Sequence, residues 1–200
     1  MSGEGPFDGE AQDVAAGATP LSIEERAGLR PSYIATRGQL NEAEQANILA
    51  ANKVLFGRRR PWKPVDLAQA EFLRWVHRKM YGDVWSWAGE YRRSDKNIGV
   101  PWMTVPVATE GFLRDVRAFP PDELAIRFHH RMVLIHLFPN GNGRHSRAMA
   151  DLMILSLGGT RFTWGGSALG GHDEVRRQYI AALREADRHE IGPLLVFART

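Results

Sequence analysis

Two apolar helical patterns flank a short turn rich in proline, asparagine and glycine. The apolar positions of the first pattern are spaced by four, four and three residues: Leu124, Phe128, Met132 and Ile135. This spacing predicts one buried helical face. Pro139 ends the first helix, and the second apolar run begins near Arg144, directly after an Asn-Gly-Asn-Gly sequence. The chain is therefore constrained to place two packed helices around a tight loop.

Helical spacing also recurs along most of the remaining sequence. Further helices are predicted over residues 41–55, 66–82, 110–119, 173–188 and 194–197. In the first of these, Asn41 serves as the expected cap and Glu44 occupies the third helical position. Residues 89–106 differ, because turn residues alternate there with short extended pieces, which indicates a small β-hairpin. The predicted fold class is mainly α with one hairpin.

Composition restricts the classes of function. The chain has 200 residues, 44% of them apolar, and a formal net charge of +3 that is too small to indicate nucleic-acid binding. It has no cysteine, which excludes disulfides, thiol nucleophiles and zinc–thiolate sites. A signal-like N-terminus and a run of about 20 apolar residues are both lacking. We expect a soluble cytoplasmic protein that binds neither nucleic acid nor membrane.

The turn between the two helices has the chemistry of a phosphate site. Gly141 and Gly143 allow main-chain amides to turn inward, and the start of the next helix adds unpaired N–H groups. Arg144 and Arg147, three residues apart, add guanidinium groups suited to a polyphosphate. His136 precedes the turn, and imidazole can accept a proton at neutral pH. Together these residues predict a nucleotide site with a general base beside it.

The same segment resembles the signature of the Fic family, His-x-Phe-x-(Asp/Glu)-Gly-Asn-Gly-Arg-x-x-Arg. The matching positions are His136, Phe138, Gly141, Asn142, Gly143, Arg144 and Arg147. The sequence from Leu73 to Met80, with His77, and from Gly82 to Arg92 also resembles the core of this family, and the whole chain is similar to the bacterial Fic subgroup called mobile mystery protein B. The resemblance predicts a Fic core over residues 65–200, a helical extension over 21–64 and a disordered N-terminus over 1–20.

The resemblance implies a helical bundle with a β-hairpin flap, and transfer of AMP from ATP to a Ser, Thr or Tyr hydroxyl of a target protein. Mg²⁺ or Mn²⁺ would assist, His136 would be the general base, and Arg144 would stabilise charge during catalysis. The residues that would bind the nucleotide are Gly141, Asn142, Gly143, Arg144 and Arg147. The flap residues that would clamp the target are Lys96, Asn97, Ile98, Gly99 and Val100. An antitoxin or another regulatory partner is also implied.

The sequence departs from the family pattern at two places. Asn140 stands where the signature has an acid that holds the metal, so we expect a weaker, neutral metal contact. Many Fic proteins are inhibited by a glutamate that pairs with the second signature arginine; Glu44 is the candidate here, with Arg147 as its expected partner. Three alternatives stay open: a Doc-like kinase that transfers the γ-phosphate, a transferase that uses another nucleotide, and a non-catalytic module that binds a nucleotide or a partner.

Overall fold

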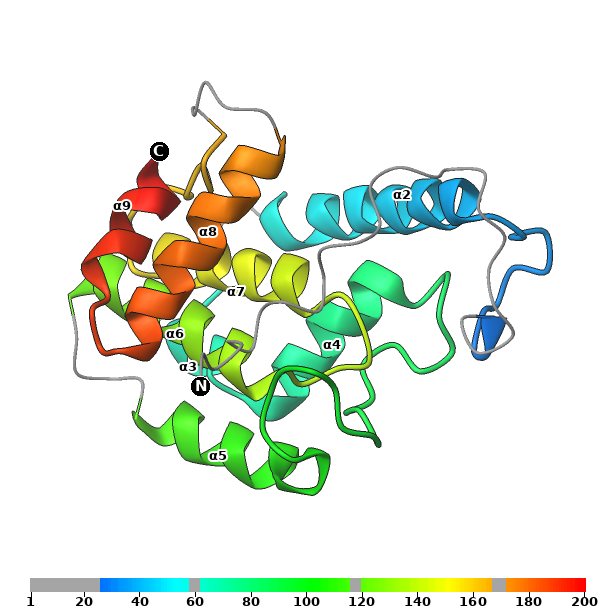
Figure 1. Cartoon of the computed structure of the whole chain (residues 1–200), viewed down its shortest axis with the longest axis horizontal. Helices are drawn as coiled ribbons and strands as arrows, with labels where there is room; N and C mark the ends of the chain where they lie inside the picture. Colours follow the sequence, from blue (N-terminus) through cyan, green and yellow to red (C-terminus); the bar gives the residue numbers. More distant parts are fainter. Residues whose placement is uncertain (1–25, 58–61, 116–119, 167–171) are drawn as a thin grey trace, which may run out of the picture.

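The computed structural model of the protein describes residues 26–57, 62–115, 120–166 and 172–200. These residues form an assembly of packed helices (Figure 1). The helices are α2 (Arg37–Phe56), α3 (Pro64–Leu67), α4 (Ala70–Tyr81), α5 (Val105–Asp115), α6 (Pro121–Ile135), α7 (Asn142–Ser156), α8 (His172–Asp187) and α9 (Gly192–Arg199). A 3-10 turn, η2 (Trp102–Thr104), precedes α5. The predicted mainly α class is confirmed, whereas the disorder expected over residues 1–20 lies outside the described residues.

Helix α7 forms the centre of the assembly. It packs most extensively against α6 and also contacts α3 and α4. Its buried positions extend around most of its circumference, which is typical of a helix enclosed by others. The four apolar positions predicted for the preceding helix are all buried on α6: Leu124, Phe128, Met132 and Ile135. The α6–α7 pair therefore holds the intervening loop on a rigid core.

Helix α2 starts earlier than the sequence indicated. Thr36 caps it, since its side chain accepts from the Gln39 N–H while the Gln39 side chain accepts from the Thr36 N–H, forming a capping box. The expected cap at Asn41 is wrong, because that residue lies inside the helix. Helix α2 packs along α4, and Figure 1 shows it in blue and cyan at one side of the assembly. This places Glu44 in mid-helix, where it is free of any capping role.

The predicted β-hairpin is absent, since the described residues between 89 and 106 contain no strand. Residues 90–101 form a loop, and α5 then begins at Val105 with Pro106 in its first turn, where proline is tolerated. The Asp95 carboxylate accepts from the Trp102 N–H at 2.8 Å, and the Arg92 side chain donates to loop carbonyls. These side-chain bonds replace the main-chain ladder that a hairpin would need.

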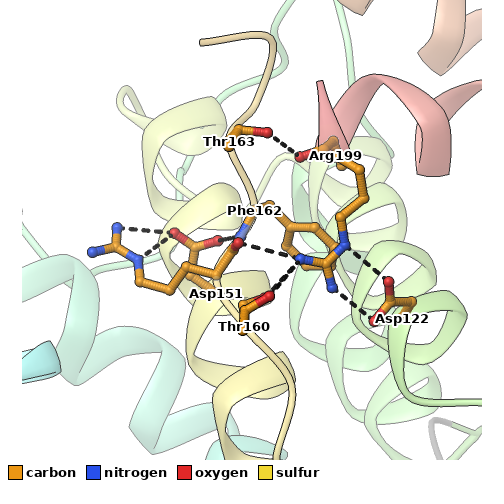
Figure 2. A network of polar contacts seen from close by, with 8 residues as sticks. Asp122, Asp151, Thr160, Phe162, Thr163 and Arg199 are labelled. Atoms are coloured by element: carbon orange, nitrogen blue, oxygen red, sulfur yellow. Dashed lines mark hydrogen bonds and ion pairs between the residues drawn. The ribbon is translucent and has the colours of Figure 1, made fainter. Parts of the chain in front are cut away.

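Two carboxylates hold the C-terminal helix and the segment after α7 to the core, as Figure 2 shows. Asp122, at the start of α6, accepts two hydrogen bonds from Arg199 of α9, at 2.8 and 2.9 Å. Asp151 of α7 is buried and accepts from Arg161, the Phe162 N–H and the Trp164 indole. Burial raises the pKa of the Asp151 carboxyl. The segment after α7 is thereby held to α6, α7 and α9.

None of the helices in the described part of the chain has the length and apolar character required to cross a bilayer.

Candidate functional site

His136 ends helix α6 in a backbone conformation that few side chains adopt. Its φ and ψ are 54° and 66°, in the left-handed region, and its N–H donates to the Met132 carbonyl at 3.1 Å. For a residue other than glycine this conformation costs about 1 kcal/mol. The surrounding structure must therefore hold His136 in place as the chain leaves the helix and enters the loop.

The side chain that holds this helix end is Arg92, which is 1% exposed. Its Nε donates to the His136 carbonyl at 2.6 Å, and its Nη2 donates to the Ile135 carbonyl at 3.3 Å. Its Nη1 donates to the Ser94 carbonyl at 3.0 Å, and its Nη2 also donates to the Val100 carbonyl. A single buried guanidinium thus joins the end of α6 to both limbs of the loop over residues 90–101.

Sequence reasoning missed the role of Arg92. Two consecutive arginines in a polar segment predict solvent-exposed side chains, and the side chain of Arg93 is indeed exposed. The partners of Arg92 on α6 lie 43 and 44 positions away, so local sequence gives no signal for them.

The five residues expected to form the flap lie in this loop. Gly99 sits directly against the candidate base, with a φ of 102°, and a Cβ added there would lie 2.7 Å from the His136 Cβ. Lys96, Asn97 and Gly99 are exposed, whereas Ile98 and Val100 are half-buried. The loop is therefore close to His136, although it lacks the strand form that was predicted.

The His136 imidazole is kept neutral by its surroundings. The residue is 6% exposed, and its Nδ1 is buried without a hydrogen-bond partner. Burial, followed by the charges of Arg92 and Lys96, lowers the pKa of His136 to about 4. At neutral pH the ring is accordingly unprotonated and able to accept a proton.

The loop after His136 is closed by the side chain of Asn142. Its Oδ1 accepts from the Phe138 N–H at 2.9 Å, and its Nδ2 donates to the Phe138 carbonyl at 2.8 Å. The Phe138 ring is fully buried and stacks on His77 with ring centroids 3.8 Å apart. This packing anchors Phe138, and with it the loop, in the core. The side chain of Asn142 is used inside the loop, because both of its polar atoms are bonded there, and its role in nucleotide binding stays a prediction.

His77, which lies in the upstream stretch that resembles the Fic core, supports the same loop from α4. Its Nδ1 accepts from the Gly89 N–H at 3.0 Å, so its Nε2 carries the proton and donates to the Asn140 carbonyl at 3.0 Å. Burial lowers the pKa of His77 well below its usual value, which keeps this tautomer neutral. The loop therefore rests on a fixed hydrogen-bonded ring.

The two glycines of the loop have different environments. Gly141 has a φ of 78°, and a Cβ there would lie 2.5 Å from Cζ of Tyr81. Glycine is thus required at position 141 by the fold itself. Gly143 lies in the first turn of α7, and a Cβ there would meet nothing within 4 Å. The fold leaves Gly143 unexplained, although glycine weakens a helix relative to alanine.

The two arginines of α7 contact different neighbours. Arg144 donates from Nη2 to Glu44 Oε2 at 2.6 Å and lies over the Tyr81 ring at 5.2 Å. Arg147 lies over the Tyr179 ring of α8 at 4.5 Å, and its Nε is buried without a hydrogen-bond partner. The expected pairing of Glu44 with Arg147 is therefore wrong in this structure. Glu44 reaches the first turn of α7, whereas Arg147, one turn later, faces α8.

A protein-held metal site is not formed by the described residues. No group of three His, Cys, Asp or Glu side chains lies close enough among them to hold a metal ion. Asn140 is exposed, and its Oδ1 already accepts from the Gly141 N–H at 2.7 Å. A neutral, engaged amide oxygen does not fit the preference of Mg²⁺ for charged oxygen ligands.

The sequence of this region matches a known protein family. Residues 66–154 match the model of the Fic/DOC family, and this range contains α4, α6, the loop and nearly all of α7. These residues form a Fic/DOC domain. The resemblance to the Fic signature is thereby confirmed, whereas the likeness to the mobile mystery protein B subgroup stays a prediction, and we call the segment from Phe138 to Arg144 the Fic loop.

Solved Fic domains share the fold. Fic-1 from C. elegans matches with a TM-score of 0.66 and 21% identity over 91% of this chain, which spans 55% of that protein's structure. BepC from Bartonella tribocorum, with bound AMPPNP, matches with a TM-score of 0.62 and 13% identity, covering 93% of both chains. A Fic domain from Bartonella quintana with bound ADP matches with a TM-score of 0.61 and 15% identity, covering 84% of this chain and 86% of that one.

Proposed function

We propose that this Fic protein transfers AMP from ATP to a Ser, Thr or Tyr hydroxyl of a target protein. The observation that carries the proposal is the neutral, buried His136 beside the Fic loop at the N-terminal end of α7. A base must be unprotonated to act, and an imidazole next to phosphate-binding amides can receive a hydroxyl proton as the hydroxyl attacks. The ligands of the BepC and B. quintana structures support ATP as the donor.

In the proposed reaction, the target hydroxyl oxygen forms a bond to the α-phosphorus of ATP. His136 takes the hydroxyl proton, and the bond from the α-phosphorus to the oxygen bridging to the β-phosphorus breaks. Pyrophosphate leaves with the electron pair of that bond, so atoms and charge balance. The first N–H groups of α7 and the Arg144 guanidinium would stabilise the charge that develops on the phosphate oxygens.

Gly143 supports this view of the loop. Because no neighbour requires glycine at position 143, its lack of a side chain is best explained by a ligand that approaches the main chain there. The nucleotide is proposed to arrive with Mg²⁺ or Mn²⁺ held by phosphate oxygens and water. Asn140→Asp is expected to strengthen the dependence of nucleotide binding on Mg²⁺, measured by titration calorimetry.

The function is tested by intact-mass analysis of the purified chain and candidate targets with ATP and Mg²⁺. A gain of one AMP that disappears in His136→Ala supports the proposal. Parallel reactions with ATP labelled at the α- or the γ-phosphate distinguish AMP transfer from a Doc-like kinase, and a nucleotide panel identifies another donor. Labelling by His136→Ala at the wild-type rate would show that the assigned base is wrong.

Glu44 is proposed to restrain this activity. It is 3% exposed, accepts from the Trp85 indole at 2.7 Å and holds Arg144 at 2.6 Å. While Glu44 holds that guanidinium, Arg144 is less available to a triphosphate. The restraint would end when α2 moves or when a partner, such as an antitoxin lost from a complex, changes its position.

A further inference from the structure

A broad groove lies between α2 and the segment from α4 to Glu90. Its volume is about 840 Å³, and none of its lining residues belongs to the loop that connects α6 and α7. One wall consists of α4 and the turns that follow it, and Arg30 extends this wall on the N-terminal side. The other wall is formed by the later part of α2. The groove is thus a concave surface separate from the Fic loop.

The α4 wall carries an excess of positive charge. The cationic lining residues are Arg30, Arg74, Arg78 and Lys79. Arg74 is paired with Glu71 at 2.8 Å, whereas no carboxylate of the described residues lies within ion-pair distance of the other three.

The two acidic lining residues are engaged by neighbours. Asp83 accepts from the Asn47 side chain at 3.1 Å, and Glu90 pairs with Arg93 at 3.2 Å. The lining therefore carries four cations against two carboxylates, and three of the cations have no carboxylate partner among the described residues. A ligand for this wall must supply negative charge.

The α2 wall is largely apolar. It contributes Ala50, Ala51 and Val54, and Val54 is 48% exposed. On the opposite side, Trp75 offers a half-buried ring with Lys79 Nζ 5.9 Å from its centroid. Facing walls of this kind match a ligand with acidic groups on one side and aliphatic groups on the other.

We propose that this groove binds an acidic amphipathic segment of a partner protein. A nucleic acid fits less well, because a regular row of phosphates would meet the carboxylates of Asp83 and Glu90 and gain little from the apolar wall. A peptide can space its carboxylates around those two acids and place aliphatic side chains on Ala50 and Val54. The inference goes beyond the proposed reaction and does not depend on it.

The position of the groove predicts that binding there stabilises the contact between α2 and α4. Trp85, whose indole donates to Glu44, lines the groove together with Asn47, one turn from Glu44 on α2. Asn47 also accepts from the Asp83 N–H at 2.9 Å and donates to the Lys79 carbonyl at 3.0 Å. A segment that contacts both walls therefore stabilises α2 against α4 and raises the melting temperature of the protein.

The test is fluorescence anisotropy with a labelled helical peptide that has glutamate on one face and leucine on the other. We expect saturable binding to the full chain that weakens with salt. Arg30→Glu/Arg78→Glu/Lys79→Glu should bind at least tenfold more weakly, and so should Val54→Glu. The milder triple glutamine variant should lie between the wild type and the triple reversal, which guards against loss of folding as the cause.

The matched control reverses three exposed arginines outside the groove: Arg114, Arg177 and Arg188. It changes the net charge equally, and its affinity should stay within twofold of the wild type. Equal weakening by both triple variants, or no binding by the wild type, would overturn the proposal. Tighter binding of a single-stranded oligonucleotide of equal charge would overturn the choice of a peptide.

Discussion

Glu44 Oε2 lies 2.6 Å from Arg144 Nη2, which joins the middle of α2 to the first turn of α7 across 100 positions of sequence. Glu44 is almost fully buried, with a side-chain exposure of 4%, whereas that of Arg144 is 43%. The carboxylate is also bonded to the Trp85 indole, so its position is fixed from two sides. This contact links α2 directly to the Fic loop, and substitution of either residue tests it.

Glu44→Gln is expected to increase AMP transfer and to tighten ATP binding, each by about tenfold. The substitution removes the charge that holds Arg144 while leaving an acceptor for Trp85, and a charge-assisted bond contributes about 1.5–3 kcal/mol. Self-labelling with α-labelled ATP measures the first effect, and titration calorimetry measures the second.

Glu42→Gln is the matched control, because Glu42 is exposed on the same helix. It should leave both quantities unchanged. Unchanged activity in Glu44→Gln, or an equal rise in the two variants, would remove Glu44 as a restraint.

Arg92→Met is expected to lower the free energy of unfolding by about 3 kcal/mol, because carbonyls at the end of α6 lose their buried donor. The effect on AMP transfer should be larger than the loss of folded protein explains, since His136 loses the group that fixes its left-handed backbone. Denaturant unfolding and initial labelling rates at matched folded concentration measure the two effects.

Arg93→Met serves as the control for this substitution. Its side chain is 82% exposed and pairs with Glu90, so a change within about 0.5 kcal/mol is expected. Similar losses in the two variants would contradict the central role given to Arg92.

The sequence predicted most of the fold because its signals are local. Helical spacing located α6 and α7, although α6 ends at Ile135, ahead of Pro139, and α7 begins at Asn142, inside the Asn-Gly-Asn-Gly turn. These residues act on their own backbone, through proline ring closure, positive φ and period, so a single sequence suffices to interpret them.

The parts that were missed depend on contacts between distant residues. The hairpin expected near Gly99 is a loop, because Arg92 donates to its carbonyls and replaces strand pairing. Glu44 was expected to reach Arg147, yet the way α2 crosses α4 brings it to Arg144. Neither outcome follows from periodicity or turn chemistry, which carry no information on how separate helices cross.

Alanine at the two loop glycines should separate a structural role from a binding role. Gly141→Ala is expected to lower the free energy of unfolding by at least about 2 kcal/mol, because φ is 78° and the new Cβ meets the Tyr81 ring. Gly143→Ala is expected to leave stability unchanged or to increase it by up to about 1 kcal/mol, since alanine is the better helix former. Thermal and denaturant unfolding measure both changes.

The same two variants differ in nucleotide binding if the Fic loop holds phosphate. Gly143→Ala should bind ATP at least tenfold more weakly in spite of its intact fold, because its methyl group occupies the space beside the first N–H groups of α7. Gly111→Ala on α5, where a Cβ also meets nothing within 4 Å, is the matched control and should bind ATP normally. Normal ATP affinity in Gly143→Ala would argue against phosphate at this turn.

The pH dependence of AMP transfer tests the environment of His136. The lowered pKa of His136 also acts on the free energy of unfolding. Because the pKa of His136 falls on folding, its contribution to that free energy is present above the ordinary histidine pKa, near 6.5, and is lost as the pH falls towards the pKa of the folded protein. Because burial and the charges of Arg92 and Lys96 lower the pKa of His136 to about 4, kcat/KM should stay level from pH 8 to about pH 5. Lys96→Met removes one of those charges and should move the acidic limb to higher pH, whereas Lys63→Met should not. A limb at pH 6.5 in the wild type would mean that burial does not keep this imidazole neutral.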